Sequence, residues 1–234
     1  MKNLLLILSI LLLFSSVSAQ EITNTSEFVP LSFSSNFFTT IPKLKTPPKG
    51  SVYLNENYTK GMIIVNDTSY IKDVKLNFNF YTDKIEVYQN DTIYNIDPYL
   101  VKWFTLNGSN FGMYTTPGPL KKYNEFKDCN LVKLYYKENN TVLLEKYYLK
   151  LLKSNYNTAV DAGETSDTYV VYSKLYLVKD NNVYKFSKRK SSILNIFADQ
   201  KDSLKTFVKD NNLKYNKLSD IIKIIAYYDS LSTK

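Results

Sequence analysis

The chain has 234 residues, carries a formal net charge of +8, and contains no histidine and one cysteine, Cys129. The lack of histidine excludes catalytic triads with an imidazole base and metal sites built on imidazole ligands. One cysteine cannot form a disulfide within the chain, and Asp128 beside it disfavours a reactive thiolate. The six glycines form no phosphate-binding loop, so no cofactor is expected.

Nearly all of the positive charge comes from lysine, because Arg189 is the only arginine in the chain. Nucleic-acid recognition commonly uses the planar guanidinium group, so specific binding of nucleic acid is not expected. Residues 185–234 hold eleven basic and five acidic side chains. This concentration of charge favours solubility and non-specific attraction to anions.

Residues 1–19 have the features of a secretory signal peptide. An apolar run covers residues 4–14, and Val17 and Ala19 stand at the −3 and −1 positions of a cleavage site. The run is shorter than the roughly 20 residues of a membrane-spanning helix. We therefore expect a mature chain that begins at Gln20, has no transmembrane segment, and is periplasmic, attached to the cell surface or secreted.

Residues 20–50 contain four of the seven prolines and predict an extended leader or linker. From residue 51 the pattern changes to short apolar runs separated by Asn and Asp turns, which predicts a first antiparallel β block over residues 51–110. Within it, apolar residues alternate with polar ones from Val74 to Phe80. This period of two predicts a strand with Asn77 and Asn79 on its solvent face.

A second β block is predicted over residues 120–190, with one hairpin from 131–137 and 142–152 and another from 169–179 and 183–187. Residues 191–231 change to a helical period, in which Leu218, Ile221, Ile222 and Ile225 share one face. A preceding helix is expected to end at Asn211 and Asn212. The predicted fold class is α+β, with predominantly antiparallel sheets and two or three C-terminal α-helices, and residues 51–231 could form a single domain.

The segment "LYLVKDNNVYKFSKRKSSILNIFADQKDSLKTFVKDNNLKYNKLSDIIKIIAYYDSL" resembles the C-terminal part of a group of uncharacterised secreted proteins of the Bacteroidota. The earlier "GMIIVNDTSYIKDVKLNFNFYTDKIEVYQNDTIYNIDPYLVKWFTL" is similar to their N-terminal block, in which Asp97, Pro98, Val101 and Phe104 stand at matching positions. The resemblance implies an exported protein with a strand-rich body and a helical tail. It implies no activity and no functional residue.

Two segments are candidate binding sites. Asp161, Glu164 and Asp167 stand in "DAGETSD", where oxygen ligands could hold a calcium ion. Because the spacing fits no EF-hand loop, an ordinary acidic loop is the favoured alternative.

The second candidate site has cations beside a predicted helix start, an arrangement that favours a bound anion. It comprises Lys188, Arg189, Lys190, Ser191 and Ser192. A lipid phosphate or an acidic glycan would be suitable ligands. A solvated turn, with its charges screened by salt, is the favoured alternative.

These features suggest an exported non-catalytic β-rich module with a binding or structural role at the bacterial cell envelope. Its partner would be an envelope protein, a glycan or an anionic lipid. The alternative is a carboxylate-dependent hydrolase acting on glycans, which needs two acidic side chains about 5 to 9.5 Å apart. No motif singles out such a pair, so no catalytic residue is assigned.

Overall fold

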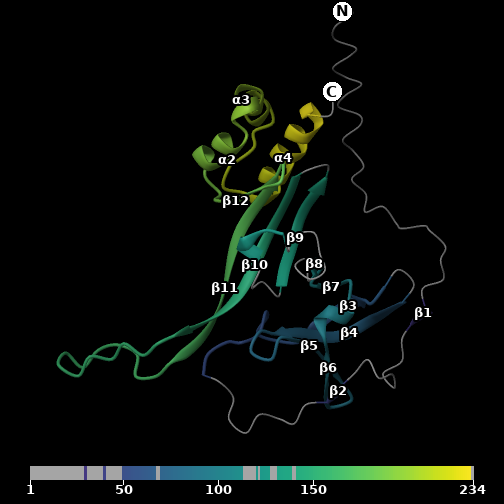
Figure 1. Ribbon diagram of the computed structural model, residues 1–234, viewed down its shortest axis with the longest axis vertical. Helices are drawn as coiled ribbons and strands as arrows, with labels where there is room; N and C mark the ends of the chain where they lie inside the picture. Colours follow the sequence, from purple (N-terminus) through teal and green to yellow (C-terminus); the bar gives the residue numbers. More distant parts are fainter. Residues whose placement is uncertain are drawn as a thin grey trace, which may run out of the picture.

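The computed structural model describes residues 29–30, 39–40, 49–66, 69–112, 120, 122–126, 131–138 and 141–232. The predicted signal peptide, most of the predicted leader, and Cys129 lie outside these residues. The expected fold class is confirmed: the protein is rich in mostly antiparallel strands, and three α-helices follow them at the C-terminal end (Figure 1).

The first β block contains β3 (Thr59–Ile64), β4 (Ser69–Asn79), β5 (Lys84–Gln89), β6 (Thr92–Ile96), the 3-10 helix η2 (Pro98–Leu100), β7 (Trp103–Leu106) and β8 (Ser109–Gly112). Two short strands, β1 (Val29–Pro30) and β2 (Thr39–Thr40), pair with β4 and β6. The second block contains η3 (Asn124–Phe126), β9 (Leu131–Glu138), β10 (Thr141–Leu152), β11 (Thr168–Lys179) and β12 (Asn182–Lys185). The helical segment contains α2 (Lys190–Ile196), η4 (Ala198–Gln200), α3 (Lys201–Asp210) and α4 (Leu218–Ser232).

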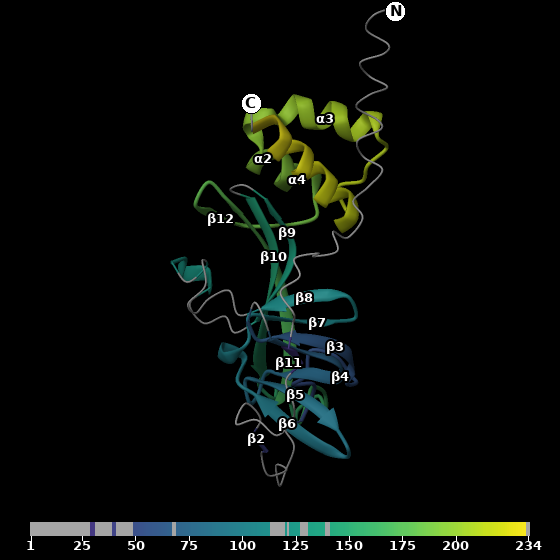
Figure 2. The ribbon, with the colours of Figure 1, turned by 90° about the vertical axis from the view of Figure 1, so that its right-hand side faces the viewer.

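All of these strands belong to one 12-stranded sheet in the order β12-β11-β10-β9-β8-β7-β3-β4-β5-β6-β2, with β1 attached in parallel to β4. The two predicted blocks are joined where β8 pairs with β9, through Phe111 opposite Lys133 and Gly112 opposite Val132. Figure 2 shows the helices gathered at one end of the sheet and the strands of the first block at the other.

The alternation expected in β4 is only half correct. Val74, Leu76 and Phe78 are buried as predicted, but Asn77 and Asn79 are buried too, with 1% and 4% of their surface exposed. The segment before β3 covers this second face, because Asn77 donates to the carbonyl oxygen of Asn55 at 2.8 Å. Asn79 donates to the Glu86 carboxylate at 2.7 Å. The alternation can be read from the local sequence. Burial of the second face depends on the packing of residues before β3, which the local sequence does not show.

The helix ends follow the predicted signals closely. Helix α3 ends at Asp210, and Asn212 takes the left-handed backbone conformation with a φ of 51°, as expected for an Asn cap. In α4, Ile221, Ile224 and Ile225 are fully buried. Helix α2 begins at Lys190, one residue before the expected Ser191, and no side chain caps it.

Strands β10 and β11 are each 12 residues long and extend beyond their neighbours. Strand β9 pairs with β10 only as far as Tyr147, and β12 pairs with β11 only from Tyr176. We call the remainder of this ribbon, residues 148–175, the arm. None of its residues is buried, and Figure 1 shows it projecting away from the helices.

Side chains of β10 and β11 alternate between two faces with different neighbours. On the odd-numbered face, Leu143 and Leu177 pack against the helices, while further along Tyr147 and Tyr169 contact Phe80 and Tyr81 of the first block. On the even-numbered face, the first part of the ribbon packs against residues near η3. This cluster contains Leu144, Val178, Phe126 and Leu120.

Candidate anion-binding pocket

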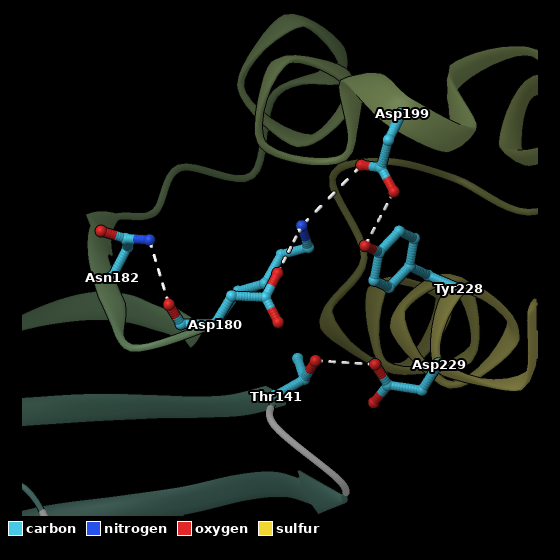
Figure 3. A network of polar contacts seen from close by, with 7 residues as sticks. Thr141, Asp180, Asn182, Asp199, Tyr228 and Asp229 are labelled. Atoms are coloured by element: carbon cyan, nitrogen blue, oxygen red, sulfur yellow. Dashed lines mark hydrogen bonds and ion pairs between the residues drawn. The ribbon is translucent and has the colours of Figure 1, made fainter. Parts of the chain in front are cut away.

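The helical segment is held on the sheet by apolar packing and a polar network. Thr141 of β10 and Tyr136 of β9 each donate a 2.7 Å hydrogen bond to the Asp229 carboxylate in α4. Tyr228 donates to Asp199 at 2.9 Å. Figure 3 shows the consecutive residues Tyr228 and Asp229 of α4, with Tyr228 facing η4 and Asp229 facing the start of β10.

Lys179 brings a positive charge into this network. Its Nζ lies 3.0 Å from the Asp180 carboxylate, 3.8 Å from that of Asp199, and 5.1 Å from the centre of the Tyr228 ring. Burial alone would lower the pKa of Lys179, but these neighbours raise it overall. Contacts of this kind fix the orientation of the helices, so the surface they present is preorganised.

A pocket of about 520 Å³ opens on the helical segment. It is lined by Lys190, Lys205, Val208, Lys209, Asn212, Leu213, Lys214 and Tyr215. Four of these eight side chains are lysines and none is acidic. The polar rim and the apolar lining together suit a ligand that carries negative charge on an apolar body.

The turn after α3 forms one wall of this pocket. The N–H of Leu213 donates to the carbonyl oxygen of Val208 at 2.9 Å, and the N–H of Lys214 donates to the Asp220 carboxylate at 3.0 Å. These bonds fold residues 213–215 back beside α3. Leu213 and Tyr215 are anchored by contacts with the hydrophobic core under the helices.

The lysines reach the pocket from three places in the fold. Lys205 and Lys209 stand four residues apart in α3 and therefore share one helix face. Lys190 comes from the start of α2, where its Nζ lies 5.9 Å from the centre of the Tyr215 ring. Lys214 comes from the turn.

Most of this charge is uncompensated. Lys205 pairs with Asp202 at 2.8 Å. Within the part of the chain that the structure describes, the ammonium groups of Lys190, Lys209 and Lys214 form no ion pair. Three unpaired ammonium groups around a pocket with no acid in its lining create a positive potential that attracts anions.

The structure brings one of the five predicted anion-site residues, Lys190, into this pocket. Lys188, Arg189 and Ser191 are exposed and do not line it. Ser192 also lies outside the lining, and its hydroxyl accepts from the N–H of Ser187 at 3.4 Å. Sequence reasoning missed Lys205, Lys209 and Lys214; the i, i+4 lysine pair in α3 was the available signal.

The predicted metal site is not assembled in the structure. Among the described residues, no group of three acidic or sulfur-bearing side chains could hold a metal ion, and Asp161, Glu164 and Asp167 all lie within that part. Asp167 instead pairs with Lys153 at 2.7 Å and accepts from the N–H of Ser154 at 2.8 Å. Asp161 accepts from the Tyr156 hydroxyl. These contacts direct the carboxylates of Asp161 and Asp167 to partners within the loop.

Several shielded carboxylates are satisfied by tyrosines. Tyr58 donates to Glu86, and Tyr135 and Tyr147 donate to Glu145 at 2.6 and 2.9 Å. Burial alone would raise the pKa of Glu145, but hydrogen bonds from Ser173, Tyr135 and Tyr147 lower it overall. A chain without histidine and with 21 tyrosines uses phenols as the donors for these acids.

The hydrolase alternative gains no support from this arrangement. Glu86, Glu145 and Asp229 have separate sets of hydrogen-bond partners. The hydroxyl of Tyr136 does touch both Asp229, at 2.7 Å, and Glu138, at 3.2 Å. However, Asp229 is only 4% exposed and both of its oxygens accept hydroxyl protons, so it does not face a substrate.

No family model, curated protein or solved structure matches this chain. In the described part of the chain, no helix is both long enough and apolar enough to cross a membrane. By its fold, this is an α+β protein with one extended sheet and helices at one end. The lysine-lined pocket on those helices is its candidate functional site.

Proposed function

We propose that this protein is an exported, non-catalytic, β-rich module that binds an anionic component of the bacterial cell envelope through the pocket on its helical segment. The observation that carries the proposal is the convergence of Lys190, Lys205, Lys209 and Lys214 around one pocket whose lining contains no acid. Export rests on the signal-peptide features of residues 1–19. The resemblance to secreted proteins of the Bacteroidota supports the same location.

The ligand we propose carries phosphate or carboxylate groups beside an apolar part. Lysine ammonium groups bind such groups as mobile point charges with three donors each. Val208, Leu213 and Tyr215 provide apolar contacts in the same pocket. Burial raises the pKa of Tyr215, which keeps its phenol neutral and able to donate a hydrogen bond.

Two probes test the proposal on the mature chain, residues 20–234. Calorimetric titration with inorganic pyrophosphate measures binding of a free anion, and co-sedimentation with phosphatidylglycerol vesicles measures binding of a lipid headgroup. Phosphatidylcholine vesicles are the neutral control. We expect at least one anionic probe to bind, and we expect its affinity to fall as salt rises.

The double variant Lys209→Gln/Lys214→Gln locates the site. We expect it to weaken binding of the positive probe about tenfold or more. The control Lys60→Gln/Lys72→Gln removes the same charge from two exposed lysines of the first block and is expected to change affinity less than about twofold. Failure of both probes to bind, or equal losses in the two variants, would contradict the proposal.

A further inference from the structure

The even-numbered face of the arm carries alternating lysine and tyrosine side chains. We propose that this face binds an acidic glycan, meaning a chain of sugar rings that bear carboxylate or sulfate groups. The surface is separate from the pocket on the helices and does not rest on it. It is formed by Tyr148, Lys150, Tyr172 and Lys174, and we call it the lysine–tyrosine face.

The register of the ribbon places these side chains together. Tyr148 stands opposite Tyr172. Lys174 stands opposite Lys146, whose ammonium group donates to the carbonyl oxygen of Glu125 at 2.7 Å, at the edge of the covered part of the ribbon. The two tyrosine rings lie 5.9 Å apart with nearly parallel planes. The Nζ of Lys174 lies 5.2 Å from the Tyr148 ring centre, and that of Lys150 lies 6.0 Å from the Tyr172 ring centre. Each ring therefore has a cation beside it.

This face is uncovered by the part of the chain that the structure describes. Lys150, Tyr172 and Lys174 are exposed, and Tyr172 keeps 38% of its surface accessible. The opposite, odd-numbered face is the one that contacts the first block, through Tyr147 and Tyr169. Two adjacent tyrosine rings on an uncovered face offer a ligand a flat aromatic contact surface.

The charge of the lysine–tyrosine face is one-sided. Among the described residues, Lys150 and Lys174 form no ion pair and have only ring contacts. The acids near the two ends of the arm are Glu145 and Asp167, and both stand at odd-numbered positions. Glu145 accepts a hydrogen bond from Tyr135, and Asp167 pairs with Lys153. The face therefore complements a ligand of negative charge.

A sugar chain fits the remaining features best. A flat tyrosine ring matches the C–H face of a sugar ring, its hydroxyl can hydrogen-bond, and a lysine beside it pairs with a carboxylate or sulfate. An open ribbon suits an extended ligand. Nucleic acid is less suitable because the face has no arginine. An anionic membrane would be repelled by Asp161 and Glu164, which are exposed in the loop of the arm.

The test measures binding of polygalacturonate oligomers to the mature chain, with dextran as the uncharged control. We expect Lys150→Gln/Lys174→Gln to weaken binding about tenfold and Tyr172→Leu to weaken it about fivefold. A matched control, Lys137→Gln/Lys185→Gln, removes two exposed lysines of neighbouring strands. That control, and the pocket variant Lys209→Gln/Lys214→Gln, should each change the affinity less than about twofold.

Circular dichroism checks that each variant is folded, which we expect because no residue of the arm is buried. The proposal is overturned if polygalacturonate does not bind, if dextran binds equally well, or if the pocket variant loses as much affinity as the arm variant. Tighter binding of single-stranded DNA or of phosphatidylglycerol vesicles to the same lysines would also overturn it, in favour of that ligand. Since the pocket is probed by separate variants, failure here leaves the proposed function intact.

Discussion

The hydroxyl of Thr141, at the start of β10, donates a 2.7 Å hydrogen bond to the Asp229 carboxylate near the end of α4. Both residues are buried, and 88 positions of sequence separate them. Together with the bond from Tyr136, this contact joins the helical segment to the sheet. It holds in place the helical segment that carries the lysine pocket.

Asp229→Ala is expected to destabilise the fold by about 3 kcal/mol, because it leaves the buried Thr141 hydroxyl without its acceptor and removes the shorter of the two hydrogen bonds of the Tyr136 hydroxyl. Thr141→Val should cost about 1 kcal/mol, and the double variant should cost less than the sum. Urea denaturation measures each value. The control is Asp210→Ala, which removes an exposed acid at the end of α3. Its free energy of unfolding should stay within about 0.5 kcal/mol of that of the unchanged protein. Additive losses at Thr141 and Asp229 would show that the two residues are not coupled.

Alkaline pH is expected to destabilise the protein through its shielded tyrosines. Burial and then an adjacent carboxylate raise the pKa of Tyr58, Tyr135, Tyr136 and Tyr147 well above the usual value of 10.0. A group with a raised pKa in the folded state contributes stability below its unfolded pKa, and this contribution declines as the pH rises above that value. Each such tyrosine should cost at most about 1.4 kcal/mol of stability per pH unit above about pH 10, and less because its phenol is partly exposed to solvent.

The measurement is the free energy of unfolding between about pH 8 and pH 11, together with spectrophotometric titration of the phenols. We expect part of the tyrosinate signal to appear only when the protein unfolds. Tyr147→Phe should make the decline in stability with pH shallower. A single titration step near pH 10 that includes all 21 tyrosines in the folded protein would be inconsistent with this account.

Gly61 is expected to tolerate no side chain. A Cβ at this position of β3 would lie 2.0 Å from the backbone oxygen of Thr105 in β7 and 2.8 Å from the Leu76 side chain. Gly61→Ala should therefore lower the free energy of unfolding by about 3 kcal/mol or more, because the hydrogen-bonded strands β3 and β7 cannot move apart locally to make room for the methyl group. At Gly108, with a φ of 70° and no atom within 4 Å of the added Cβ, Ala should cost only about 1 kcal/mol of backbone strain. Equal thermal midpoints for the two variants would refute the steric argument.

The loop of the arm should be dispensable for folding. Replacing residues 154–166 by Asn-Gly would join Lys153 to Asp167, which already form an ion pair across the ribbon, through a turn suited to a hairpin. Because none of the removed residues is buried, the denaturation midpoint should not change measurably. Binding of pyrophosphate or phosphatidylglycerol vesicles to the helical pocket should also be retained. A clear loss of cooperativity would mean that the loop supports the sheet.

Local sequence signals identified the elements of this protein well. The two hairpins of the second block, the Asn cap after α3 and the apolar face of α4 all depend on interactions within a few residues. The boundary between the predicted blocks was less informative, because β8 pairs with β9 across it and makes one sheet. Pairing partners of strands are set by turn geometry and packing that no single window of sequence contains.

By itself, the sequence determined the fold class, the chemistry that the chain lacks, and the concentration of lysine near its end. Tertiary structure alone decided which lysines meet, since Lys190, Lys209 and Lys214 come together only when the turn after α3 folds back beside that helix. It likewise decided that Asn77 and Asn79 are buried and that the arm presents Tyr172 and Lys174 on an open face. The physical reason is the same in each case: composition and periodicity act over a few residues, whereas a binding surface depends on contacts between residues far apart in the chain.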